Sequence, residues 1–206
     1  MDNHTHPNDV VSALLNHRST PAGLLDEPAP DAENLATILQ CGLSAPDHAN
    51  VQPWKFITIA AEAREKFGDV LVQAKTKDDP NFTDEQAEAL RKKPLRAPMI
   101  IAVAASITPN HPKTPRVEQV LTAGVSAQQM QIAARALGFG SIWLTGPMAR
   151  NTLVKTALGL KEDDELVGFL YIGTPTKSVP ERKRPTPQEF TSVWNGPEPS
   201  EENSKR

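Results

Sequence analysis

The sequence contains one cysteine, Cys41, among its 206 residues. A single thiol excludes an intramolecular disulfide bond and any site built from several cysteines. Its apolar, helical surroundings favour a packed thiol over a catalytic one. No apolar run approaches the roughly 20 residues that span a bilayer, and Met1–Asp9 is polar, without the hydrophobic segment of a secretory signal. We therefore expect a cytoplasmic protein.

An excess of charge of either sign is also missing. The chain has 22 basic and 25 acidic side chains, so nothing in the charge balance points to nucleic acid or to an anionic membrane. Hydrophobic residues make up 38% of the chain, enough for one core. We expect a single domain over residues 8–194, followed by a polar, proline-bearing tail at 195–206 that we expect to be disordered.

Several catalytic and nucleotide-binding motifs are absent. Gly138-Phe139-Gly140 follows a helical segment and opens a strand, the reverse of a dinucleotide-binding turn. There is no phosphate-binding GxxxxGK[ST] loop and no GxSxG nucleophile. No two of the five histidines have metal-ligand spacing, so we expect no metal site. If the protein is an enzyme, a cofactor is then expected to carry the chemistry.

Hydrophobic periodicity predicts an α+β domain, with a small central sheet flanked by helices. The segment 116–137 is the longest periodic stretch. Its small residues suit the helix at the core of a dimer, although an ordinary buried helix has the same pattern. The predicted helices are 8–17, a helix capped by Asp31 that ends near Gly42–Pro46, 62–75, 83–92, 116–137 and 151–158, and the predicted strands are 54–60, 99–105, 138–145 and 166–173.

Three segments together resemble the FMN-dependent NAD(P)H nitroreductase family, and in particular its smallest bacterial members. They are Asn16-His17-Arg18-Ser19-Thr20, then Gly42 to Trp54 with its Ala-Pro-Asp-His and Gln-Pro-Trp sequences, and then Gly138 to Trp143 continuing to Leu166–Pro175. The resemblance covers about residues 9–190. The family usually has arginine where this chain has His17, and small members tend to have arginine in place of Ser44.

The resemblance implies a nitroreductase-like fold with a mostly antiparallel sheet and a long central helix at a dimer interface. It implies a homodimer with FMN between the subunits and NADH or NADPH as the electron donor. Hydride would pass through the flavin to a nitroaromatic, quinone or similar acceptor. The flavin would carry the reaction, so no side chain is expected to be catalytic. The charged helix at 83–92 is expected to border the pocket and to influence the choice of acceptor.

The same resemblance assigns site residues, and the chemistry of the side chains agrees with it. A flavin phosphate needs cationic and hydroxyl donors, and the flat ring needs an apolar slot. The segment Ala45–Trp54 is expected to reach the partner's flavin. The cofactor-binding residues implied are His17, Arg18, Ser19, Ser44, His48, Gln52, Trp143, Leu144, Thr145, Arg182 and Arg184. The residues implied for the nicotinamide nucleotide are Ala133, Ala134, Arg135, Ala136, Leu137 and Gly138.

Each assignment has a simpler alternative. Arg18 and the basic run Arg182–Arg184 are also explained as solvated surface charges. Trp143 is also explained as a core aromatic residue, and the small residues before Gly138 by helix packing. His48 could be a loop histidine satisfied by backbone groups.

Three alternatives for the function stay open as well. One is a flavin-binding, redox-sensing dimer with little turnover, and another is a flavin reductase for an activated alkene or a halophenol. The third is an interaction module without a cofactor.

Overall fold

The computed structural model describes residues 7–180 and 182–196. Its sheet is built around two long strands, β3 (Met99–Ala105) and β5 (Glu165–Pro175). β2 (Lys55–Ala60) pairs with β3, while β4 (Gly140–Leu144) and the two-residue β1 (Leu25–Asp26) pair with β5. Every one of these pairings is antiparallel. The predicted α+β class and its antiparallel sheet are therefore confirmed.

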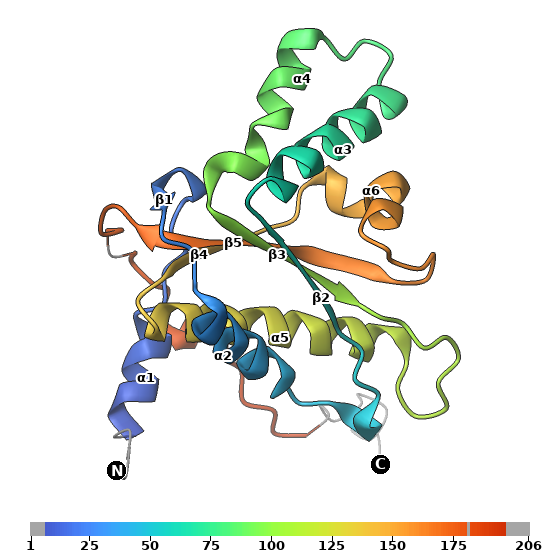
Figure 1. Cartoon of the computed structure of the whole chain (residues 1–206). Coiled ribbons are helices and arrows are strands. Elements are labelled where there is room, and N and C mark those ends of the chain that lie inside the picture. The colour runs from blue at the N-terminus through green and yellow to red at the C-terminus, as the bar shows by residue number, and fades with distance from the viewer. Residues whose placement is uncertain (1–6, 181, 197–206) are drawn as a thin grey trace, which may run out of the picture.

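Helices cover both faces of the sheet (Figure 1). On one face lie α2 (Ala32–Leu43) and the long α5 (Arg116–Ala136), which pack against each other. On the other face lie α3 (Ala63–Asp78), α4 (Asp84–Arg91) and α6 (Thr152–Ala157). The first helix, α1 (Pro7–Leu15), lies beside the C-terminal end of α5.

β3 is buried on both faces because it supplies both cores. Its residues alternate, as strand geometry requires. Ile100 and Ala102 face α3 with Phe67 and Phe169, whereas Ile101 and Val103 face α2 and α5. A strand between two helical layers reads as a continuous apolar run, which explains how the sequence MIIAVAA could be recognised as a central strand.

The element boundaries differ from the predicted ones by a few residues. α1 ends at Leu15, so His17 lies in the following loop and not in the helix. β5 extends to Pro175, beyond the predicted end at Gly173. β1 was not predicted, because a two-residue strand has no detectable alternation. Asp31 caps α2 as expected, with its carboxylate accepting a hydrogen bond from the backbone of Asn34.

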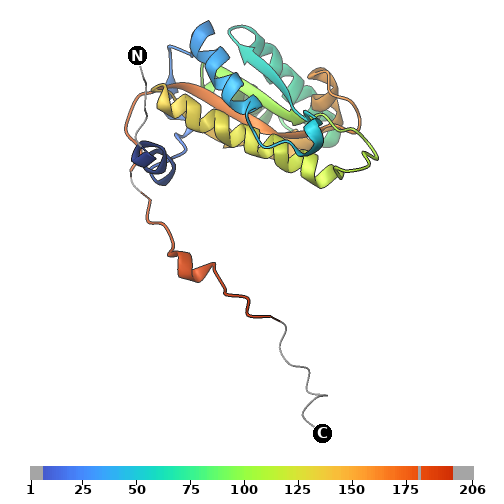
Figure 2. The same ribbon diagram turned by 90° about the horizontal axis from the view of Figure 1, so that it is seen from below.

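The described residues beyond β5 run outward from the body of the molecule (Figure 2). Phe190, Val193 and Trp194 in this segment are each more than 70% exposed, at 76%, 83% and 82%. Residues 197–206 of the predicted disordered tail lie outside the described residues. In the described part of the chain, no helix has both the length and the apolar character needed to cross a bilayer.

Candidate functional site

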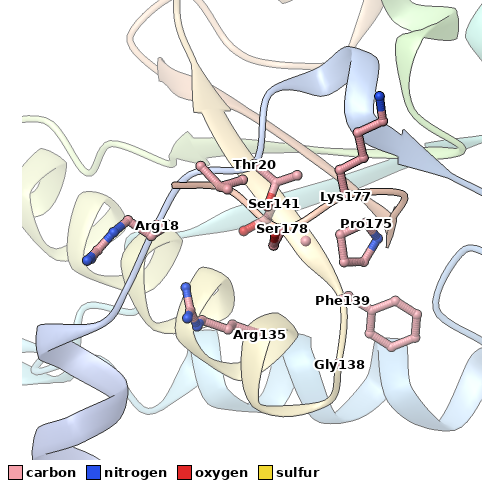
Figure 3. Close-up of a pocket in the computed structure, with 11 residues that line it drawn as sticks. Arg18, Thr20, Arg135, Gly138, Phe139, Ser141, Pro175, Lys177 and Ser178 are labelled. Atoms are coloured by element: carbon pink, nitrogen blue, oxygen red, sulfur yellow. The ribbon is translucent and has the colours of Figure 1, made fainter. Parts of the chain in front are cut away.

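A cationic cavity of about 290 Å³ lies at the start of β4, where α1, α5 and the chain after β5 meet. Figure 3 shows Arg18 and Arg135 extending on the same side of β4, one from the loop after α1 and the other from the last turn of α5. Thr20, Ser141 and Ser178 line the same cavity, as does Lys177. Cations, hydroxyl groups and backbone amides therefore surround one space.

A third arginine joins this group from the far end of the sequence. Arg184 donates a hydrogen bond from Nη2 to the carbonyl oxygen of His17 at 2.8 Å, and Arg18 Nη1 donates to the same oxygen at 2.9 Å. Burial lowers the pKa of His17 below its usual value, and the positive charges of Arg135, Arg184 and Arg18 lower the pKa further. Three arginines therefore act on His17 from different parts of the chain.

One acidic residue lies near these cations, because Asp9 lines an adjoining pocket together with Arg18 and Arg135. None of the ion pairs within 4.0 Å among the described residues includes Arg18, Arg135 or Arg184. Two buried nitrogen atoms, Arg18 Nε and His17 Nδ1, have no hydrogen-bond partner. Buried donors without partners are costly, and convergent guanidinium groups match the oxygens of a phosphate. The donor set therefore fits a phosphate dianion.

From this cavity the uncovered edge of β4 leads to Thr145. The backbone amide of Thr20 donates to the carbonyl of Ser141 at 2.8 Å, so the backbone groups of Ser141 point away from β5. Because strand residues alternate, the backbone N–H and C=O of Trp143 face the same edge. Thr145 lies exposed at the end of that edge. A flat polar molecule lying along β4 would meet these groups in turn.

Trp143 contributes its side chain to the core, in addition to its backbone groups at the edge of β4. Its side chain is half-buried against the core between the sheet and α5, and Nε1 donates to the carbonyl of Val167 at 3.2 Å. Gly168, with φ of 154°, leaves space for the indole, because a Cβ there would collide with Trp143. The indole orientation is therefore fixed by the fold.

A second cavity, of about 490 Å³, opens beside the end of β4 beneath α3 and α4. Its walls are mainly apolar, with Phe67, Leu71, Leu90, Phe169 and Tyr171 among the lining residues. A short 3₁₀ helix, Lys93–Arg96, follows α4 and contributes its first and last residues to the lining. Trp143, Leu144 and Thr145 line the same cavity, so it adjoins the edge described above.

The loop that follows α2 is held rigidly against the N-terminal half of α5. Ser126 Oγ donates to Gly42 O at 2.6 Å and Thr122 Oγ1 to Pro46 O at 3.3 Å. One turn further along α5, Glu118 Oε2 contacts His48 Nδ1 at 2.8 Å. Positions 118, 122 and 126 are four residues apart and so lie on one face of the helix.

The same loop contains unusual backbone geometry. Ala49, Asn50 and Gln52 have φ values of 62°, 52° and 52°. Asp47 stabilises this shape, because its carboxylate accepts from the amides of Val51 and Gln52 at 3.1 and 2.7 Å. The side chains of His48 and Gln52 remain exposed on a preformed surface.

The predicted site residues fall into two separate groups in one chain. His17, Arg18, Arg184 and Trp143–Thr145 lie at the cationic cavity or along β4. His48 contacts Glu118 near the other end of α5, a helix of 21 residues, or about 30 Å at 1.5 Å per residue. Ser44 lies nearer the middle of the helix, where its hydroxyl contacts Gln129. A single chain does not bring the two groups together.

The remaining predicted residues show mixed placements. Ser19 and Arg182 are exposed, and neither makes a side-chain contact with another described residue. Ala133 and Ala134 are buried in the core between the sheet and α5, which is a packing role. Ala136 and Leu137 are exposed, whereas Arg135 and Gly138 line the cationic cavity.

Sequence reasoning assigned no role to Thr20, although it ends the first of the three resembling segments. It did not single out Lys177, Ser178, Lys93 or Arg96, which carry ordinary polar or basic side chains with no motif around them. Only the fold places these residues at the two cavities.

This arrangement belongs to a known class of enzyme. Residues 15–174 match the nitroreductase family, and the chain is a member of that family of oxidoreductases. The family membership expected from the sequence is therefore confirmed.

Individual relatives agree with this result. The chain is 43% identical over 187 residues to "Putative NAD(P)H nitroreductase YdjA" of Escherichia coli, covering 90% of this chain and 100% of that protein. Among solved structures, a nitroreductase-like family protein from Bacillus cereus superimposes with a TM-score of 0.79 at 24% identity, covering 95% of this chain and 100% of the other. A nitroreductase from Desulfovibrio desulfuricans, solved in complex with FMN, gives a TM-score of 0.67 at 24% identity and covers 94% and 99%.

Proposed function

We propose that this protein is an FMN-dependent oxidoreductase that uses NADH or NADPH to reduce nitroaromatic compounds, quinones or similar acceptors. The observation that carries the proposal is the cluster of Arg18, Arg135 and Arg184, which lies with the hydroxyl groups of the cavity at one end of an uncovered strand edge. The name of the YdjA relative and the FMN complex of the Desulfovibrio desulfuricans protein support the cofactor and the donor. A cytoplasmic location stays a prediction.

Different residues would bind different parts of FMN. The arginine cluster would bind the phosphate, with hydroxyl donors from Thr20 and Ser141. The edge of β4 up to Thr145 would accept the polar rim of the ring. The chemistry that FMN would supply in this position is hydride transfer between NAD(P)H and the acceptor. The protein residues orient the ring, exclude water through the apolar cavity and supply positive potential.

A homodimer would bring the two residue groups of the site together. Val117, Leu121 and Val125 form an exposed apolar stripe along α5, at 61%, 62% and 42% exposure. Exposed apolar stripes of this kind mark association surfaces. A two-fold axis across this stripe would align two α5 helices antiparallel and place the His48 loop of each subunit against the α5 helix of its partner. The exposed Phe190 and Trp194 offer further surface for a second copy.

The first test is a visible spectrum of the purified protein, with and without added FMN, together with its oligomeric state. We expect flavin absorbance, release of FMN on denaturation, a dimer, and oxidation of NADH or NADPH with a nitroaromatic or a quinone. A colourless protein that cannot take up FMN would contradict the proposal. A yellow protein with negligible turnover would instead favour a flavin-binding redox sensor.

A further inference from the structure

The apolar cavity beneath α3 and α4 contains two cations and no carboxylate. Lys93 and Arg96 line it, and no acidic residue is among its lining residues. Neither cation takes part in the ion pairs among the described residues. Their neighbours Arg91 and Lys92, in contrast, both bind Glu88. The two cations at the cavity are therefore available to a ligand.

Arg96 is already oriented by the protein. Its guanidinium carbon lies 5.5 Å from the centre of the Tyr171 ring, and Nε donates to the carbonyl oxygen of Lys93 at 3.1 Å. Stacking on the Tyr171 ring, a hydrogen bond to the Tyr171 hydroxyl and one backbone bond orient the guanidinium, which has five N–H donors in all. A planar donor held in this way is suited to a carboxylate or a similar flat anion.

The rest of the cavity is suited to an aromatic ring. Phe67, Leu90, Phe169 and Tyr171 provide apolar and aromatic walls. The volume of about 490 Å³ is in the range of small-molecule pockets, about 300–1,000 Å³. The cavity also adjoins Thr145, the residue at which the edge of β4 ends.

We propose that this cavity selects a small aromatic electron acceptor that carries an anionic group, which Lys93 and Arg96 bind while the ring lies against the apolar walls. The proposal rests on the function proposed above and names its substrate class. For a nitroaromatic acid, one NAD(P)H and one proton convert the nitro group to a nitroso group and water, and the donor leaves as NAD(P)⁺. The anionic group itself does not react.

The test compares two acceptors of similar shape, 4-nitrobenzoate and 4-nitrobenzamide. The ratio of their kcat/KM values is measured in the natural protein and in the double variant Lys93→Gln/Arg96→Gln. Because the intrinsic reducibility of each acceptor is the same in both proteins, it cancels when the ratios are compared. We expect the ratio to fall about tenfold or more in the double variant, the factor that corresponds to one charge-assisted hydrogen bond.

Lys92→Gln is the matched control, since Lys92 is adjacent in sequence but lies outside the cavity lining and binds Glu88. We expect this variant to leave the ratio within about twofold of the natural value, as for an exposed ion pair. Near-ultraviolet circular dichroism of all variants checks that the aromatic core is intact.

A second measurement does not depend on turnover. Calorimetric titration with benzoate and with benzamide should show tighter binding of benzoate to the natural protein, and this preference should disappear in the double variant. An unchanged kcat/KM ratio and an unchanged benzoate preference in the double variant would overturn the proposal. It would also be overturned if the KM for NADPH rose while the ratio stayed constant, because the cations would then bind the phosphates of the donor.

Failure of this proposal is distinguishable from failure of the proposed function. FMN content and NAD(P)H oxidation with a neutral quinone test the function alone. Benzoate binding tests the cavity alone.

Discussion

The two ends of α5 differ in how completely their polar groups are satisfied. At the N-terminal half, Glu118 and Thr122 hydrogen-bond to the loop that follows α2, and Ser126 hydrogen-bonds to the last turn of α2. At the C-terminal end, Arg135 and Arg18 line one cavity, and Arg18 Nε has no hydrogen-bond partner. The polar groups of the first end are paired within one chain, whereas the second end presents donors suited to an anion. Binding sites and structural contacts can be distinguished on this basis.

The largest expected effect comes from removing charge at the C-terminal end of α5. In the double variant Arg18→Gln/Arg135→Gln, FMN affinity should fall by at least about 100-fold, because hydrogen bonds to charged groups contribute roughly 1.5–3 kcal/mol each. Fluorescence titration of the stripped protein with FMN measures this change. Lys66→Gln, an exposed cation on α3, is the control and should bind FMN normally. Equal FMN affinity in the double variant and the control would show that Arg18 and Arg135 do not bind the FMN phosphate.

A smaller effect, on stability, is expected at the N-terminal half of α5. Ser126 is fully buried and its hydroxyl donates to Gly42 O. In Ser126→Ala this carbonyl loses its shortest hydrogen bond and keeps the longer one from the Ala45 amide, at 3.4 Å, so the free energy of unfolding should fall by about 1 kcal/mol. Urea denaturation measures the change, with the exposed Thr76→Ala on α3 as the control, expected within about 0.5 kcal/mol. If Ser126→Ala were as stable as the control, the loop would not depend on this bond.

The smallest effect concerns the pH dependence of stability. The pKa of His17 in the folded protein is lowered by burial and by the positive charges of Arg135, Arg184 and Arg18. Below pH about 6.5, the unfolded chain therefore binds a proton more readily than the folded one. Stability of the FMN-free protein is therefore lost as the pH falls from about 6.5 toward the lower folded pKa. Thermal unfolding at pH 7.5 and 5.5 should show a smaller difference in His17→Gln than in the natural protein. An equal difference in both proteins would contradict the environment described for His17.

Sequence alone predicted the regular elements well, for identifiable reasons. β3 is an uninterrupted apolar run, α5 has sustained helical periodicity, and Asp31 is a recognisable helix cap. Local patterns do not reveal which distant residues meet. From the sequence alone, Arg135 belongs to the residues 133–138, for which helix packing is an alternative explanation. The fold shows that Arg135 lines the same cavity as Arg18.

Other features had no sequence signal at all. The left-handed backbone of Ala49 is unusual for alanine. Its loop is held by Asp47, by Thr114 just before α5 and by Glu118 on α5. Lys93 and Arg96 belong to a strongly charged stretch in which no residue stands out, and their role follows from the position of one 3₁₀ helix above the cavity.

The uncovered edge of β4 has a further consequence for the behaviour of the protein without its ligand. Unpaired backbone groups along a strand can recruit a strand from another chain, which is a common beginning of aggregation. Only the start of this edge, at Ser141, is protected by Thr20. A flavin lying along the remaining part would shield it, so cofactor supply during expression should govern the yield of dispersed protein as well as its colour.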